Sequence, residues 1–311
     1  MINRSLAKNI FKKSFIIIST KFSPVFSTVL LLAALNQSYL IAQSDSESNE
    51  LTVMTYNIRF AGVNPQSDTN DWEHRKNFVT DLFIKNSPDI IGLQEALLSQ
   101  INYIDSVLII YNWEGIGRDD GFKKGEFSPI FYKKDKFQLI TKGTFWLSWT
   151  PYKPSKGWDA AFNRVATWIQ LKDKESGKYF YVYNTHFDHV GDSARYESAK
   201  LIMNKIVEET SGDPVILMGD FNFTKESKGY KEITSSSNKK MFDAQFVSAT
   251  PHTGGNITFN GFGTIEGPGE KIDFIFVTEN ISVNSHSIIA KKYEGRFPSD
   301  HYPVLSKIKF N

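Results

Sequence analysis

The chain contains no cysteine among its 311 residues. Disulfide bonds, thiol nucleophiles, iron–sulfur clusters and zinc–thiolate sites are therefore excluded. Histidine is also scarce, with six residues, and no two of them have the HxxxH spacing typical of zinc sites. The sequence therefore does not favour a structural zinc site, and any metal chemistry must depend on oxygen and nitrogen ligands.

A large surplus of one charge is missing as well. The chain has 36 lysine and arginine residues against 34 aspartate and glutamate residues. Residues 1–42 contain five of the basic residues and no acidic one, so the rest of the chain has a formal charge of −3. A strongly basic surface is typical of nucleic-acid-binding proteins. Its absence weakens that function without excluding a local basic groove.

The first 42 residues have the pattern of a targeting segment. Basic residues up to position 21 precede an apolar run at 26–35, and a polar, acidic stretch at 43–50 follows Ala42. This order is typical of a secretory signal peptide, and we expect cleavage after Ala42. The alternative is an uncleaved membrane anchor, but the apolar run is shorter than the roughly 20 residues that a membrane span needs.

These observations predict three parts of the chain. Residues 1–42 are the signal peptide, 43–50 a polar linker, and 51–311 one folded domain. We therefore expect a secreted or periplasmic protein. The 41% hydrophobic content is enough for a sizeable core and excludes intrinsic disorder.

Strand and helix patterns alternate through the domain without a linker. Helical spacing of apolar residues predicts helices over 71–85, 96–109 and 192–210, the last capped by Asp192. Strand patterns cover 51–59, 89–93, 127–132, 137–145, 164–171, 179–185, 214–218, 271–277, 282–289 and 303–310. Because strands dominate and helices do not follow every strand, we predict an α/β fold of two packed sheets with helices outside.

Polar residues gather at the ends of these strands. They are Asn57, Gln94, Glu95, His186, Asp188, Asp220 and Asn222 after strands, Asp273 within one, and Asp300 and His301 before the last. Loops at strand ends are where a rigid scaffold presents chemically active groups. One carboxylate with several amides suits a hard cation such as Mg²⁺. A second carboxylate can activate water, and a histidine can bind a phosphoryl oxygen, so the set fits phosphate-ester hydrolysis.

The same residues lie in six motifs that occur in a characteristic order. The motifs are TYNI at 55–58, GLQE at 92–95, NTH at 184–186, GDFN at 219–222, ID at 272–273 and SDH at 299–301. In this order they resemble the endonuclease/exonuclease/phosphatase superfamily, also called the deoxyribonuclease-I-like fold. The resemblance covers about 51–310 and implies a four-layer α/β/β/α sandwich of two mostly antiparallel sheets. Further segments, at 117–132, 145–148 and 157–164, resemble a poorly characterised bacterial secreted subfamily.

The resemblance implies a metal site. Glu95 corresponds to the principal ligand, with Asn57 beside it and Asp300 near the metal. The implied cofactor is Mg²⁺, with Mn²⁺ also possible.

The resemblance also implies the catalytic residues. His186 would contact the scissile phosphate, Asp220 would orient or deprotonate water, and Asn222 would steady the phosphate. His301 would be a second histidine, oriented by Asp273.

Substrate contacts are expected from the rim of the site. Arg164, Trp158 and Asp188 are the candidates, with Phe162 available to pack an organic group. The rim loops at 117–125, 150–164 and 254–269 carry charges of both signs. Mixed signs are poorly suited to a long polyanion, whose binding relies on neutralising many phosphates.

We therefore predict a Mg²⁺-dependent phosphatase or phosphodiesterase that acts on a small or lipid-linked phosphate ester. The alternative is a secreted or periplasmic endo- or exonuclease on DNA or RNA, so nucleic acid stays a possible partner. A non-catalytic binding protein is disfavoured by the complete motif set. We expect a monomer, in contact with a membrane only through an uncleaved signal or a lipid substrate.

Overall fold

The computed structural model describes residues 50–62, 69–236, 239–265 and 269–311. The predicted signal peptide and all of the predicted linker except Glu50 lie outside these residues. Within the described part of the chain, no helix is both long and apolar enough to cross a membrane.

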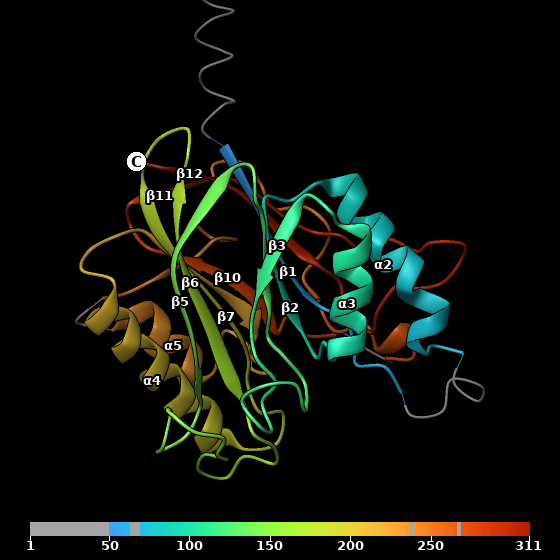
Figure 1. Cartoon of the computed structure of the whole chain (residues 1–311), viewed down its shortest axis with the longest axis horizontal. Coiled ribbons are helices and arrows are strands. Elements are labelled where there is room, and N and C mark those ends of the chain that lie inside the picture. The colour runs from blue at the N-terminus through green and yellow to red at the C-terminus, as the bar shows by residue number, and fades with distance from the viewer. Residues whose placement is uncertain (1–49, 63–68, 237–238, 266–268) are drawn as a thin grey trace, which may run out of the picture. The chain divides into compact units, whose positions relative to one another are not determined.

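Two six-stranded sheets form the centre of the domain (Figure 1). The first sheet has the order β11 (Ile281–Ile288), β12 (Val304–Phe310), β1 (Glu50–Asn57), β2 (Ile90–Gln94), β4 (Ile130–Lys133), β3 (Tyr111–Glu114). The second has the order β5 (Phe137–Trp146), β6 (Val165–Asp173), β7 (Tyr179–His186), β8 (Val215–Asp220), β10 (Asp273–Val277), β9 (Phe242–Asp243). The helices are α2 (Trp72–Asn86), α3 (Leu98–Val107), α4 (Asp192–Glu209) and α5 (Lys228–Ser235), with a 3₁₀ turn, η1, at Gly261–Gly263.

Three hydrophobic clusters hold four layers together. One lies between the sheets and includes Val53 and Ile216. A second joins the second sheet to α4 and α5, and a third joins the first sheet to α2 and α3. Figure 1 shows the two helix pairs on opposite sides of the sheets. The predicted four-layer α/β/β/α sandwich is therefore confirmed.

Several predicted boundaries move by one to three residues, and one cap is wrong. Asp71, placed inside the first helix by the sequence, is its N-cap and accepts from the backbone N–H of Glu73. Asp192 does not cap α4, whose N-cap residue is Gly191. Instead Asp159, from a distant loop, accepts from the N–H groups of Ser193 and Ala194. A cap supplied across 34 residues leaves no local sequence pattern.

The sequence patterns missed three short elements, β3, β9 and α5. The strand β9 has two residues and β3 has four, which is too short for a periodicity to register. The helix α5 spans eight residues, and the hydroxyl of its N-cap Ser227 accepts from the N–H of Tyr230. None of the three elements contributes a residue that was predicted for the site.

Each sheet contains one parallel strand pair, and every other pairing is antiparallel. The pair β1–β2 is connected through α2, and the pair β7–β8 through α4. At the carboxyl ends of these pairs Asn57 lies opposite Gln94, and His186 lies opposite Asp220. The topology therefore brings polar residues from both sheets to one edge of the sandwich.

A buried polar contact fixes the two pairs against each other. The side-chain amide of Gln94 donates to Oδ1 of Asn184 at 2.6 Å. The amide of Asn184 in turn donates to the carbonyls of Leu93 and Pro129. A side chain at Gly92 would approach Asn184 Oδ1 to 2.7 Å, so glycine is needed for this close packing. The contact sets the distance between the two halves of the site.

Candidate active site

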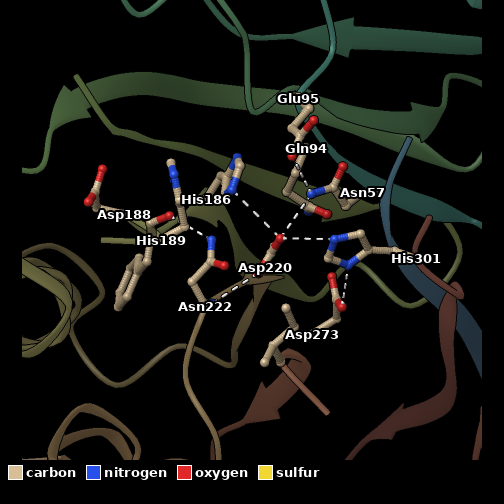
Figure 2. Close-up of polar contacts among 12 residues, drawn as sticks. Asn57, Gln94, Glu95, His186, Asp188, His189, Asp220, Asn222, Asp273 and His301 are labelled. Carbon is tan, nitrogen blue, oxygen red and sulfur yellow. Dashed lines mark hydrogen bonds and ion pairs between the residues drawn. The ribbon is translucent and has the colours of Figure 1, made fainter. Parts of the chain in front are cut away.

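A cleft of about 600 Å³ opens at the shared edge of the two sheets. It is lined by most of the predicted site residues: Glu95, Arg164, His186, Asp220, Asn222, Asp300 and His301. Figure 2 shows Asp220 near the centre, with Asn57, His186 and His301 directed toward it. The structure thus gathers residues separated by more than 200 positions in the sequence.

The buried side chain of Asn57 links two of the carboxylates. Its amide nitrogen donates to Glu95 Oε1 at 3.0 Å and to Asp220 Oδ2 at 2.9 Å. Its oxygen accepts from the backbone N–H of Arg59. In this arrangement Asn57 positions the two carboxylates and turns its nitrogen, rather than its oxygen, toward them.

His301 forms an ion pair with buried Asp273. The distance from Nδ1 to Asp273 Oδ2 is 2.8 Å, and Nε2 lies 3.7 Å from Asp220 Oδ2. Burial by itself lowers the pKa of His301, but the charges of Asp273 and Asp220 outweigh it and raise that pKa to about 10. His301 is therefore an imidazolium whose Nε2–H is directed toward Asp220.

Asp220 has the properties of a proton acceptor that works near neutral pH. Burial and the charge of Asp273 raise its pKa to about 7, against the opposing effect of His301. A general base is most effective when its pKa lies near the operating pH. Asp220 is 1% exposed, and the hydrogen bond from Asn57 holds it in one orientation.

The second histidine of the site, His186, is held neutral. Burial, and then the charge of Arg164, lower its pKa well below the ordinary value. The guanidinium of Arg164 donates to Nδ1 at 2.9 Å. Arginine has only donors, so the single ring proton is on Nε2, which lies 3.6 Å from Asp220 Oδ2. His186 therefore offers an N–H to whatever lies beside Asp220.

Asp188 and Trp158 do not reach the cleft as expected. Asp188 is 1% exposed, and its oxygens accept from Arg164 Nε and from the backbone N–H groups of Phe162, Val190 and Gly191. These hydrogen bonds lower its pKa against the effect of burial. Asp188 thus holds Arg164 in place, while Trp158 packs against Trp149 with ring centres 5.6 Å apart. Neither residue lines the cleft.

Asn222 lies at the floor of the cleft in a left-handed backbone conformation, with a φ of 49°. Its side-chain amide donates to the carbonyl of Phe187 at 3.0 Å, and its backbone N–H donates to Asp220 Oδ1. The first bond joins the loops after β7 and β8. The strained backbone thereby supports both Asp220 and the end of the parallel pair.

Glu95 and Asp300 form a pair of carboxylates suited to a hard cation. Glu95 has a φ of 60°, and its oxygens accept from Asn57 and from the N–H of Phe60. Burial raises the pKa of Asp300, and the negative charge of Glu95 adds to that rise while His301 opposes it. A divalent cation between these two carboxylates would relieve their repulsion.

A second group of potential metal ligands comprises Asp220, Asp273 and His301, with donor atoms within 4.8 Å of one another. The buried Oδ1 atom of Asp273 has no hydrogen-bond partner. However, two of these groups already have partners, because His301 Nδ1 pairs with Asp273 Oδ2 at 2.8 Å and Asp220 Oδ2 accepts from Asn57. The donor set therefore fits a cation better at Glu95 and Asp300.

The residues predicted for the site do not include Arg59, Arg75 or Arg118. Arg59 and Arg118 line the cleft, and Arg118 donates to Glu126 at 2.6 Å. Arg75 is buried in α2 and donates to the carbonyls of Ile58 and Pro298. It thereby ties the loop after β1 to the segment before Asp300. The sequence signal for Arg75 was an arginine on the apolar face of a predicted helix.

Comparison with known proteins agrees with this geometry. Residues 54–301 match the model of the endonuclease/exonuclease/phosphatase family. A crystal structure of an endonuclease/exonuclease/phosphatase from Bacteroides vulgatus is 41% identical, aligns 84% of this chain with 99% of that chain, and gives a TM-score of 0.80. The mannosyl-6-phosphatase of Bacteroides thetaiotaomicron is 37% identical, aligns 84% of this chain with 100% of that chain, and gives a TM-score of 0.78.

A more distant relative is nocturnin of Drosophila melanogaster, 28% identical over 210 residues. The match covers 60% of this chain and 31% of nocturnin, so the chain spans about a third of that protein. The family model, the two bacterial structures and the site geometry agree on one assignment. The chain belongs to the endonuclease/exonuclease/phosphatase family, whose members are hydrolases that act on phosphoester bonds.

Proposed function

We propose that this protein is a Mg²⁺-dependent phosphatase of small phosphate esters, with phosphorylated sugars as the leading substrates. The observation that carries the proposal is the end of the cleft beside His186. The guanidinium groups of Arg118 and Arg164 line that end of the cleft, and each also pairs with a carboxylate. This arrangement suits one compact anion, whereas the binding of a polyanion such as DNA needs many basic side chains along its path.

The similarity to a mannosyl-6-phosphatase supports the same substrate class. Phe162 supports it further, because its half-exposed ring stacks on His189 at the edge of the cleft. Such a ring can pack the organic part of a small substrate. The runner-up function is a nuclease, since the family also includes endonucleases and exonucleases.

Glu95 and Asp300 are the proposed Mg²⁺ ligands, and Mn²⁺ would fit the same oxygen donors. Such a cation supplies Lewis-acid polarisation of a phosphoryl oxygen when it is bound. Asn57 keeps Glu95 in position from the side.

The protein groups have separate roles in the proposed reaction. Asp220 accepts a proton from the attacking water as the water oxygen bonds to phosphorus. The bond from phosphorus to the ester oxygen breaks, and the leaving alkoxide takes a proton from solvent. The Nε2–H of neutral His186 donates to a phosphoryl oxygen, and the imidazolium of His301 compensates the negative charge that develops beside Asp220. Arg164 keeps the proton of His186 on Nε2. The two histidines thus offer two N–H donors that differ in charge.

A substrate panel with a salt series tests the proposal. With Mg²⁺ present, we expect mannose 6-phosphate to be hydrolysed with a higher kcat/KM than duplex DNA or RNA. Between about 50 and 200 mM salt we expect a shallow fall in kcat/KM, against the 10³- to 10⁵-fold loss of affinity typical of proteins with six to ten phosphate contacts. A steep fall of kcat/KM with salt, together with efficient cleavage of long DNA or RNA, would show instead that the protein is a nuclease.

We also propose that residues 1–42 export the protein and that the folded domain works outside the cytoplasm as a monomer. The basic, apolar and polar order of that segment supports export. Cell fractionation followed by N-terminal sequencing of the mature protein tests it. Sequence starting at Gln43 is the expected result, and an intact N-terminus in the cytoplasmic fraction would contradict it.

A further inference from the structure

A second cavity, of about 450 Å³, lies next to the catalytic cleft. Three chain segments line both spaces. The catalytic cleft is lined by Asn222, Phe259 and Ile272. The second cavity is lined by Thr224, Asn256 and Lys271, each of which lies within three residues of one of them along the chain. The backbone N–H of Thr258 donates to the carbonyl of Glu270 at 3.0 Å. This bond joins two of the segments into a shared wall.

The floor of the second cavity is a closed polar network. Lys271 Nζ donates to Gln245 Oε1 at 2.7 Å and lies 3.3 Å from Asp243 Oδ1. Asp243 also accepts from the hydroxyl of Tyr230 at 3.2 Å. Because its hydrogens are directed to these partners, Lys271 does not provide a free cation for a phosphate. The floor is therefore polar and fixed but is not an anion site.

The mouth of the cavity combines an exposed ring with polar groups. Phe246 is 61% exposed, and the side chains of Asn256, Glu226 and Glu270 surround the same space. Among the described residues of the lining, Lys225 and Lys271 are the basic ones, and Asp243, Glu226 and Glu270 are the acidic ones. This balance disfavours a second phosphate or a polyanion.

The chemistry fits a neutral ring that carries many hydroxyl groups. Carboxylates and amides exchange hydrogen bonds with hydroxyls, and an aromatic face packs the apolar C–H face of such a ring. The volume lies within the roughly 300–1,000 Å³ of small-molecule sites. A neutral sugar meets all three requirements.

We propose that the second cavity binds a sugar residue adjacent to the phosphorylated one, so that the preferred substrate is a phosphorylated oligosaccharide. The inference rests on the proposed function, because it assumes that the cleft receives a sugar phosphate. The cleft then holds the phosphate and its own sugar, while Phe246 and Asn256 hold the neighbouring residue.

Kinetics with substrates of two lengths test the inference. The probes are mannose 6-phosphate and the two mannobioses that carry a 6-phosphate on either residue. We expect at least one disaccharide to have a kcat/KM about tenfold or more above that of mannose 6-phosphate. Phe246→Ala should reduce this advantage to within about twofold, mainly through KM, because the ring supplies packing and no chemistry. Asn256→Ala should act in the same direction, since a hydroxyl loses its partner.

Tyr179→Ala is the matched control. Tyr179 is an exposed aromatic residue with a lysine ammonium 5.4 Å from its ring centre, as Lys225 lies 5.7 Å from that of Phe246. It begins β7, at the end opposite His186, so its loss should leave the advantage intact.

Equal kcat/KM for the short and long substrates would overturn the inference, as would a uniform loss on all of them in Phe246→Ala. Neither result would contradict the proposed function. Failure to hydrolyse any sugar phosphate, with another phosphate ester turned over, would overturn the inference together with the sugar-phosphate part of the proposed function.

Discussion

The two parallel strand pairs of this protein end at the same edge but contribute different chemistry. The pair β1–β2 ends in Asn57 and Gln94, with Glu95 directly after, and the pair β7–β8 ends in His186 and Asp220. The first pair contributes an amide and a half-exposed carboxylate. The second contributes a neutral histidine and a buried carboxylate whose pKa is raised to about 7.

The comparison shows that two strand pairs of the same topology can contribute the groups for different parts of one reaction. In both pairs a helix crossover returns the chain to a parallel strand, so that consecutive strand ends lie side by side. Exposure then decides the role of each carboxylate. Glu95 is open to the cleft and can hold a cation, whereas Asp220, buried beside Asp273, is poised to accept a proton.

The largest expected effect comes from breaking the β1–β2 half. Glu95→Gln removes the charge and keeps the shape, and we expect kcat/KM to fall at least about 10³-fold, or about 4 kcal/mol. The melting temperature should hardly change, because the side chain is half exposed. Glu175→Gln, on an exposed turn, is the control and should keep full activity. Near-normal Mg²⁺-dependent turnover in Glu95→Gln would remove the basis for the metal assignment.

The second prediction distinguishes the role of the His301 ring from that of the Asp273 carboxylate. His301→Ala should lower kcat by roughly 10² to 10⁴, the range for a positioned acid–base group. Asp273→Asn keeps the ring but lowers its pKa, and we expect a smaller loss of about tenfold. Steady-state kinetics of both variants give the comparison. A greater loss in Asp273→Asn than in His301→Ala would mean that Asp273 acts directly and not through the histidine.

The third prediction concerns the contact that joins the two halves. Asn184→Leu removes the side-chain donor to the buried carbonyl of Leu93 and one of the two donors to the carbonyl of Pro129, which keeps the backbone N–H of Leu93. We expect the free energy of unfolding to fall by about 3 kcal/mol, since each unsatisfied buried group costs roughly 1–3 kcal/mol. Urea denaturation measures it, with Asn204→Leu on the exposed face of α4 as the control. Equal stability of the two variants would show that packing alone sets the spacing of the sheets.

The smallest expected change is in the two histidines of the metal-free protein. The pKa of His301 is raised to about 10, so its stabilising contribution is complete below pH 6.5 and is lost as the pH rises toward 10. His186 has the opposite sign, because its pKa is lowered and its contribution is present above pH 6.5 and is lost as the pH falls. Near pH 7 neither ring should titrate.

Two-bond ¹H–¹⁵N NMR spectra of the histidine side chains check this prediction. They should show His301 protonated on both nitrogens and His186 protonated on Nε2 alone. Exposed His74 serves as the internal reference. A proton on Nδ1 of His186 would contradict the role assigned to Arg164.

Much of the site could be predicted because its residues lie in short motifs at strand ends. The run 53–56 indicates a strand by its apolar pattern, and the polar Asn57 that follows it marks the end. Asp188 shows the limit of this reasoning. Its position after β7 matches that of a substrate-binding residue, yet its oxygens are occupied by backbone N–H groups and Arg164.

The sequence by itself determined the family, the layered fold and many of the residues that line the cleft. Periodicity and motif order are local properties, and each can be read within a few residues. The tertiary structure alone decided that Asp159 caps α4, that Arg164 sets the tautomer of His186, and that Asp273 raises the pKa of Asp220. Each of these depends on burial and on a partner that the fold brings close from a distant position, and electrostatic interaction follows distance in space, not separation along the chain.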